Sequence, residues 1–151
     1  MHAAWLALGA NIGNPLAQLD EAVDRLDRHP RIAVMKRSAV IVTKAWGKTD
    51  QPDFHNMAIA VQTSLGPHAL LEACLATEAA MGRERVEHWG PRLIDVDVIA
   101  FEREVMDTPD LKLPHPFAHE REFVLTPLRE IAPEVADWIV ERSRQAAHPH
   151  S

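Results

Sequence analysis

Two aspartates separated by one residue carry the strongest chemical signal in this sequence. Asp95 and Asp97 lie in the run 93–101 (LIDVDVIAF), which is branched and apolar and contains no breaker. A Gly-Pro pair precedes the run, so the sequence predicts a β-strand that begins at about Leu93. Because side chains alternate between the faces of a strand, both carboxylates point the same way, about 7 Å apart. Such a pair favours a divalent cation that prefers oxygen ligands, such as Mg²⁺.

The apolar residues around the aspartates indicate how the strand packs. Alternation places Leu93, Ile99 and Phe101 on the face of the two acids. The opposite face is filled by Ile94, Val96 and Val98. A strand that is apolar on both faces is expected in the interior of a sheet. There, ionised carboxylates are costly unless a positive charge compensates them.

Basic side chains on both sides of this strand suggest what the cation would serve. Arg92 comes just before it, and the flanking loops carry Arg83, Arg85, His115 and Arg121. Carboxylates that hold a metal, together with cations that meet a polyphosphate, favour phosphoryl-type transfer. No Ser-His-Asp, Cys-His or zinc-binding spacing stands out. Taken singly, the Asp-x-Asp pair also fits two surface acids, and each arginine fits a surface cation.

Length and charge exclude several classes of protein. The 151 residues suit one domain that can bury a core without disulfides. A formal net charge of −6 argues against a nucleic-acid partner, although it permits a local pocket for a small anion. The single cysteine, Cys74, lies in an apolar helical pattern and suits a reducing cytoplasm. We see no signal peptide and no segment that could span a bilayer, so a cytoplasmic monomer without a membrane partner is expected.

The hydrophobic pattern predicts an α+β fold with the order β-α-β-β-α-β, the split βαβ arrangement of a ferredoxin-like sandwich. The expected elements are a strand at 3–8, a helix at 15–28, strands at 32–43 and 54–64, a helix at 67–82 and the strand from 93. Residues 102–151 are expected to form an extension of a short strand at 111–116 and helices at 125–131 and 133–144. Residues 1–151 then form a single domain, with 145–151 as a frayed tail.

The turn Gly9-Ala-Asn-Ile-Gly13 connects the first strand to the first helix. Asn14 is expected to cap that helix, and Pro15 fits its first position. The glycines lack the spacing of known phosphate-binding loops, so an ordinary tight turn is favoured over an anion cradle, which stays open.

Two further residues fit their surroundings poorly. Glu78 falls on the apolar stripe of the second helix, so its carboxylate must reach either a polar partner or water. The residues that share this stripe are Leu70, Leu71, Cys74 and Leu75. Trp46 lies in the polar loop 44–53, where an aromatic side chain suits stacking on a flat ring.

Several motifs, spread over about residues 5 to 133, together resemble the 6-hydroxymethyl-7,8-dihydropterin pyrophosphokinase family. This family moves the terminal pyrophosphate of ATP onto a pterin alcohol in folate biosynthesis. The motifs are Gly9-Ala-Asn-Ile-Gly13, Asp50-Gln-Pro-Asp-Phe54-His-Asn56, Gly82-Arg83-Glu-Arg85, Trp89-Gly-Pro-Arg92-Leu-Ile-Asp95-Val-Asp97, Leu113-Pro-His115 and Arg121-Glu-Phe123. The Trp-Gly-Pro-Arg-x-x-Asp-x-Asp element is the most specific of them.

The resemblance implies a role for each of these residues. Asp95 and Asp97 would bind two Mg²⁺ ions, and Arg83 and Arg92 would stabilise charge on the transferred group. Asp97 could also take the hydroxyl proton, although activation by the metal is the alternative. On the pterin side, the implied residues are Phe54 and Phe123 as ring-stacking partners, Asn56 at the polar edge, and Thr43, Trp46 and Asp95 nearby. On the ATP side, the implied residues are Glu78, Arg85, Trp89, Arg92, Val98, His115 and Arg121.

The chain also departs from the family pattern. Lys44-Ala45 stands where many members carry prolines, and Pro116 stands where some have an aromatic residue. Leu75 and Asp110 replace a glutamine and an arginine of some members. Two other readings therefore stay open. The first is an inactive relative or ferredoxin-like binding module, and the second is a metal-dependent nuclease, against which the net charge speaks.

Overall fold

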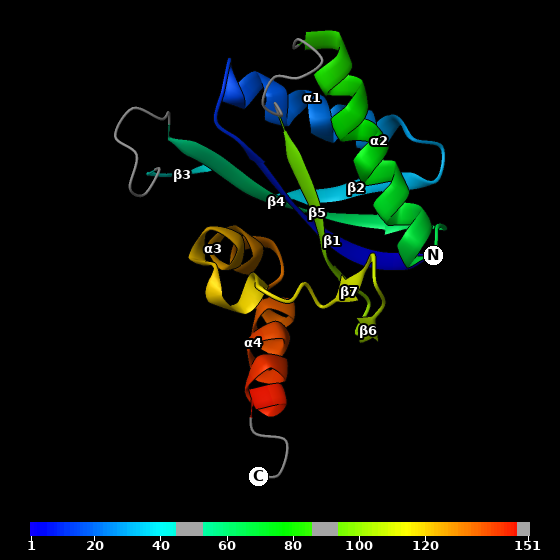
Figure 1. The fold of residues 1–151 in the computed structure, drawn as a ribbon, viewed down its shortest axis with the longest axis vertical. Coiled ribbons are helices and arrows are strands. Elements are labelled where there is room, and N and C mark those ends of the chain that lie inside the picture. Colours follow the sequence, from blue (N-terminus) through cyan, green and yellow to red (C-terminus); the bar gives the residue numbers. More distant parts are fainter. Residues whose placement is uncertain (45–52, 86–93, 148–151) are drawn as a thin grey trace.

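A five-stranded antiparallel sheet forms the centre of the computed structural model, which describes residues 1–44, 53–85 and 94–147 (Figure 1). Its strands are β1 (His2–Ala10), β2 (Ile32–Arg37), β3 (Ile41–Thr43), β4 (Phe54–Thr63) and β5 (Asp95–Phe101). The strand order is β2-β4-β1-β5, and β3 also pairs with β4. A separate two-stranded ladder joins β6 (Met106–Asp107) to β7 (Lys112–Leu113). The protein is therefore of mixed α/β class with an antiparallel sheet.

Helices cover both faces of the sheet. On one face, α1 (Pro15–Arg28) and α2 (Pro67–Arg85) pack over a core that includes Leu6, Leu19 and Leu70. On the other face lie a short 3-10 helix, η1 (Ala118–Glu120), with α3 (Glu122–Ile131) and α4 (Pro133–Ala147) (Figure 1). They pack over a second core that includes Ala58, Leu125 and Ile139. The expected extension is thus a structural layer that closes one side of the sheet.

The predicted boundaries are close to the observed ones in the first half of the chain. Helix α1 spans the predicted residues, and the Asn14 side chain accepts a hydrogen bond from the Ala17 N–H at 3.2 Å. The predicted strand at 32–43 is instead two strands, β2 and β3. Between them, the Ser38 N–H donates to the Ala58 carbonyl, and the Ser38 hydroxyl accepts from the Ala58 N–H, both at 2.9 Å. These bonds keep the interrupted segment attached to β4.

The helices of the second half extend further than predicted, whereas the strand expected at 111–116 is only β7, Lys112–Leu113. Helix α2 continues to Arg85, and α3 begins at Glu122 rather than at 125. Helix α4 reaches Ala147, so residues 145–147 of the expected frayed tail are helical, and 148–151 lie outside the described residues. The predicted stripe of α2 was wrong at Leu75, which is exposed, whereas Cys74 and Met81 are buried. Within the described ranges, no helix combines the length and apolarity that crossing a membrane requires.

Strand β5 corrects the prediction of an interior strand. Within the described residues it pairs only with β1, which makes it an edge of the sheet, and both aspartates are exposed. The strand is apolar beyond Asp97 because helices cover both of its faces. A register shift against β1 leaves Ile99 as an extra residue between the pairs Leu6–Val98 and Trp5–Ala100. Phe101 therefore packs in the α1/α2 core with Val98, and its predicted place on the face of the acids was wrong.

Candidate active site

A cavity of about 720 Å³ opens between the sheet and the segment that leads into α3. Its lining includes residues from β1, the end of β3, the start of β4, the start of β5 and residues 120–124. Seven of the predicted site residues meet there, namely Thr43, Phe54, Asn56, Asp95, Asp97, Arg121 and Phe123. The fold thus gathers residues from four strands and from the helices η1 and α3 at a single opening.

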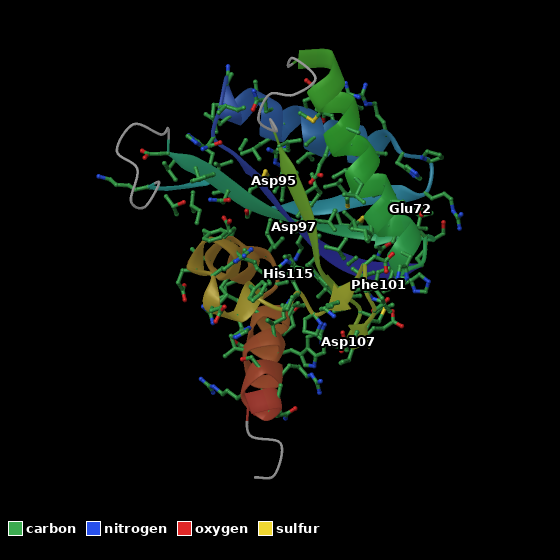
Figure 2. All side chains as sticks on the ribbon, viewed as in Figure 1. Glu72, Asp95, Asp97, Phe101, Asp107 and His115 are labelled. Atoms are coloured by element: carbon green, nitrogen blue, oxygen red, sulfur yellow. The ribbon has the colours of Figure 1, made fainter. Side chains whose placement is uncertain are left out.

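The floor of this cavity is built from small residues of β1. Gly9 pairs with Asn56 of β4 on one side and with Asp95 of β5 on the other. Ala7 pairs in the same way with Ala58 and Asp97. Both acids therefore share a face with Asn56, and the strand between them offers no large side chain to separate a ligand from either. Figure 2 shows Asp95 and Asp97 following one another along β5.

Asn56 is held in a fixed orientation at one end of this floor. It is nearly buried, and its side-chain amide donates to the Thr43 hydroxyl at 3.3 Å. A Cβ added at Gly9 would lie only 2.7 Å from the Asn56 Oδ1. Because only glycine leaves room for this carbonyl, Gly9 is part of the site. Sequence reasoning missed the roles of Ala7 and Gly9, although the alternation of small residues with Leu6 and Leu8 was a signal for them.

Two phenylalanines from different elements line the cavity. Phe54 comes from the start of β4 and Phe123 from the first turn of α3, and each is 37% exposed. Large aromatic side chains usually bury their rings, so these exposed faces suit a flat ligand that would cover them. The Lys44 residue, noted in the sequence only as a departure from the family, also lines the cavity.

Arg121 supplies a positive charge to the same wall. It is the N-cap residue of α3, and its carbonyl accepts from the Val124 and Leu125 N–H groups, both at 2.9 Å. Its guanidinium carbon lies 5.4 Å from the ring centre of Phe117 and 5.7 Å from that of Phe123. The guanidinium therefore lies against two aromatic rings at the edge of the cavity.

His115 lies close to the charges of the site without lining the cavity. Its backbone N–H donates to the Ile99 carbonyl at 2.8 Å, and its Nδ1 accepts from the Phe117 N–H at 3.2 Å. Burial lowers the pKa of the His115 imidazole, against the upward effect of Asp97 and together with the downward effect of Arg121. The imidazole is thus neutral near pH 7, with Nδ1 as acceptor and Nε2 as the N–H donor.

Glu78 and Val98 lie behind the site rather than in the cavity wall. The Glu78 carboxylate is nearly buried and accepts from the Val96 N–H at 2.7 Å, which ties α2 to β5. Of the two fates considered for this acid, the polar partner is confirmed. Val98 is buried in the α1/α2 core. A contact of either residue with ATP stays a prediction.

Five other predicted residues are not placed by the described part of the chain. Trp46, Trp89 and Arg92 lie outside the described residues. Arg83 and Arg85 belong to the last turn of α2, but their side chains are also outside the description. Their roles therefore stay predictions.

The carboxylate pair fits a metal ion whose coordination shell is completed by a substrate. Within 1–44, 53–85 and 94–147, no group of three or more His, Cys, Asp or Glu side chains could hold an ion by itself. Mg²⁺ usually binds through one or two carboxylates, several waters and the phosphates of a nucleotide. Two exposed aspartates that open into a cavity meet this requirement.

Comparison with known proteins identifies the family of this arrangement. The family model described as 7,8-dihydro-6-hydroxymethylpterin-pyrophosphokinase (HPPK) matches residues 5–133. The chain belongs to this family. Among relatives named 2-amino-4-hydroxy-6-hydroxymethyldihydropteridine pyrophosphokinase, that of Methylorubrum extorquens is 52% identical over 135 residues, covering 89% of this chain and 85% of the relative. That of Bacillus subtilis is 44% identical over 132 residues, with 87% and 79% covered. This HPPK-family chain is thus an ATP-dependent pyrophosphokinase of folate biosynthesis.

Solved structures share the fold of this HPPK-family chain. A crystal structure of wild-type Plasmodium falciparum HPPK-DHPS aligns with a TM-score of 0.67 at 15% sequence identity, over 89% of this chain. A second, with pterin and p-hydroxybenzoate, aligns with a TM-score of 0.66 at 14% identity, over 96% of this chain. The chain spans 40% and 44% of the lengths of those two chains. At these identities the likeness concerns the fold alone.

Proposed function

We propose that this chain transfers the terminal pyrophosphoryl group of ATP to the hydroxyl of 6-hydroxymethyl-7,8-dihydropterin, in a reaction that requires two Mg²⁺ ions. The products are AMP and the pterin diphosphate. One observation carries the proposal: the Asp95–Asp97 pair shares a cavity with Asn56 and with two exposed phenylalanines. The names of the relatives support the same substrate class.

The pterin site would lie between β4 and α3. The pterin ring would stack between Phe54 and Phe123, and the Asn56 amide, oriented by Thr43, would bond its polar edge. Trp46 is proposed to help close this side. With the ring held there, the small floor at Gly9 leaves the hydroxymethyl group free to reach β5.

The acceptor hydroxyl would meet the phosphates at β5. Asp95 and Asp97 would hold the two Mg²⁺ ions, which neutralise phosphate charge and lower the pKa of the hydroxyl when bound. Asp97 is the candidate to receive the hydroxyl proton, and activation by the metal is the alternative. Attack would be in line at the β-phosphorus, with AMP as the leaving group.

The ATP site would lie on the other side of the two acids. Arg121 would bond phosphate oxygens, and His115 would act as a neutral Nε2–H donor. Arg83 and Arg92 are proposed to stabilise charge on the transferred group. The remaining proposed ATP contacts are Glu78, Arg85, Trp89 and Val98.

The strand order β2-β4-β1-β5 supports a ferredoxin-like arrangement. We also infer a cytoplasmic monomer that acts on small molecules.

A direct assay tests this function. The purified chain is mixed with ATP and 6-hydroxymethyl-7,8-dihydropterin, with Mg²⁺ or with excess chelator, and the nucleotides and pterins are separated by chromatography. We expect AMP and pterin diphosphate in equal amounts, only when Mg²⁺ and both substrates are present. Formation of ADP, or turnover that ignores the chelator, would contradict the proposal. Binding of Mg-ATP without any AMP would favour the inactive relative.

A further inference from the structure

Phe117 is a large aromatic residue that is 51% exposed and lies outside the cavity wall. Its ring lies under the guanidinium of Arg121, with 5.4 Å between the guanidinium carbon and the ring centre. Phe123 approaches the same guanidinium at 5.7 Å. Both distances are within the range of a cation–π interaction. Arg121 is thus held by two rings, of which only Phe123 lines the cavity.

A short hydrogen-bonded turn fixes the backbone of Phe117 relative to that of Arg121. The Phe117 N–H donates to the His115 Nδ1 at 3.2 Å, and the Phe117 carbonyl accepts from the Glu120 N–H at 3.2 Å. The Arg121 N–H donates to the Ala118 carbonyl at 3.2 Å. The backbone positions of Phe117 and Arg121, from which the ring and the guanidinium extend, therefore belong to one hydrogen-bonded turn.

The acids nearest to Arg121 in the sequence do not neutralise it. Glu120 lies 3.8 Å from His119, and Glu122 accepts a hydrogen bond from Thr126 at 3.4 Å. Within the described part of the chain, Arg121 makes no ion pair of its own. Aromatic rings attract a guanidinium through their faces without using its N–H groups, which stay available to an anion.

We propose that Phe117 is a positioning residue for the polyphosphate of the nucleotide, acting through Arg121. The proposal rests on the proposed function only for the identity of the anion. Because Phe117 itself does not line the cavity, it does not contact the proposed pterin site directly, and its effect is expected on the phosphates that Arg121 is proposed to bond. Removing its ring face should let Arg121 leave the cavity edge without changing the pterin site.

The test begins with kinetics. Phe117→Leu keeps an apolar side chain but loses the ring, and we expect the KM for Mg-ATP to rise about three- to tenfold. We expect kcat and the KM for the pterin to change less than twofold. Phe117→Trp keeps an aromatic face and should restore the KM for Mg-ATP. Leu16→Ala, at an exposed leucine of α1, is the matched surface control. Failure of Phe117→Trp to restore the KM would overturn the proposal.

A double-mutant cycle separates positioning from direct contact with the nucleotide. Binding of a non-hydrolysable ATP analogue with Mg²⁺ is measured by calorimetry for Phe117→Leu, Arg121→Gln and the double variant, after thermal melts have checked folding. We expect Phe117→Leu to cause no further loss when Arg121 is already replaced. An additive loss would mean that Phe117 acts without Arg121, which overturns the proposal. Phe117→Met replaces the leucine variant if that one does not fold.

The binding measurement also separates this proposal from the proposed function. It needs neither turnover nor pterin. If wild-type protein forms no AMP but the cycle shows coupling, the proposed function fails and the role of Phe117 stands. If AMP forms and the losses are additive, the proposed function stands and the role of Phe117 fails.

Discussion

Asn56 and Asp95 lie in one row across the sheet, on either side of Gly9. Two strand spacings separate their backbones, about 10 Å in all. The amide is fixed by Thr43, whereas the carboxylate opens into the same cavity from the edge strand. This row places the group proposed to recognise the acceptor ring and a group proposed to hold the metal at a distance set by the backbone.

The row makes Gly9 a sensitive position. A Cβ at residue 9 would lie 2.7 Å from the Asn56 Oδ1, so Gly9→Ala should turn the amide away from its bond to Thr43. We expect the KM for the pterin to rise about tenfold. A side-chain hydrogen bond contributes about 1 kcal/mol, and the displaced amide also no longer matches the polar edge of the pterin ring. Steady-state kinetics with the pterin varied at saturating Mg-ATP measures this.

A second glycine provides the control for this prediction. A Cβ at Gly66 would meet nothing within 4 Å, so Gly66→Ala should leave both KM values unchanged. If Gly9→Ala raised the KM for ATP as much as that for the pterin, the assignment of Asn56 to the pterin edge would be wrong.

Asp97 is predicted to be indispensable for turnover. Asp97→Asn removes one of the two carboxylates at the cavity while keeping the shape of the side chain. We expect kcat to fall by several orders of magnitude, with little change in melting temperature because the residue is exposed. Asp137→Asn, an exposed acid of α4, should behave as wild type. Near-normal AMP release by Asp97→Asn would remove the carboxylate pair from the mechanism.

Phe123 is predicted to serve the pterin more than the nucleotide. Its exposed ring faces the cavity, so Phe123→Ala should raise the KM for the pterin by fivefold or more, which corresponds to about 1 kcal/mol of aromatic interaction. A smaller rise in the KM for ATP is expected, since Phe123 also contacts Arg121. Equal rises for both substrates would show that the ring acts mainly through Arg121.

The sequence predicted the part of this site that depends on strand alternation and on motif. Asp95 and Asp97 share a face as expected, and the pattern of Pro15–Arg28 matches the observed helix. The extra residue at Ile99 could not be foreseen, because a register shift depends on pairing with β1 rather than on local residue type. The need of Glu78 for a polar partner was foreseen, but the Val96 N–H could not be named as that partner, because the bond depends on how α2 packs against β5.

The place of β5 in the sheet shows a second limit of sequence reasoning. An apolar strand was expected inside the sheet, yet β5 is an edge within the described residues. The pattern correctly indicated that both faces of the strand are covered, but it could not distinguish cover by helices from cover by neighbouring strands. The two aspartates are exposed because their face of β5 lines the cavity.

Glu78 is predicted to matter for stability. Its buried carboxylate accepts from the Val96 N–H, so Glu78→Ala leaves a backbone donor of β5 unsatisfied. We expect the free energy of unfolding to fall by about 1–3 kcal/mol in urea titrations. Glu78→Gln keeps an acceptor and should lose less. A normal unfolding free energy for Glu78→Ala, combined with a raised KM for ATP, would instead favour direct contact with the nucleotide.

His115 gives the stability of the protein a predictable dependence on pH. Burial lowers the pKa of its imidazole below the ordinary value of 6.5, so the unfolded chain takes up this proton before the folded chain does. The contribution of His115 is therefore fully present above about pH 6.5 and is lost as the pH falls below that value. The free energy of unfolding, measured by urea titration between pH 5 and pH 8, should rise with pH along a shallower slope for His115→Asn than for wild type. His29→Asn, at the C-terminal end of α1, is the control. Identical slopes for His115→Asn and wild type would mean that the folded imidazole binds protons as readily as the unfolded one.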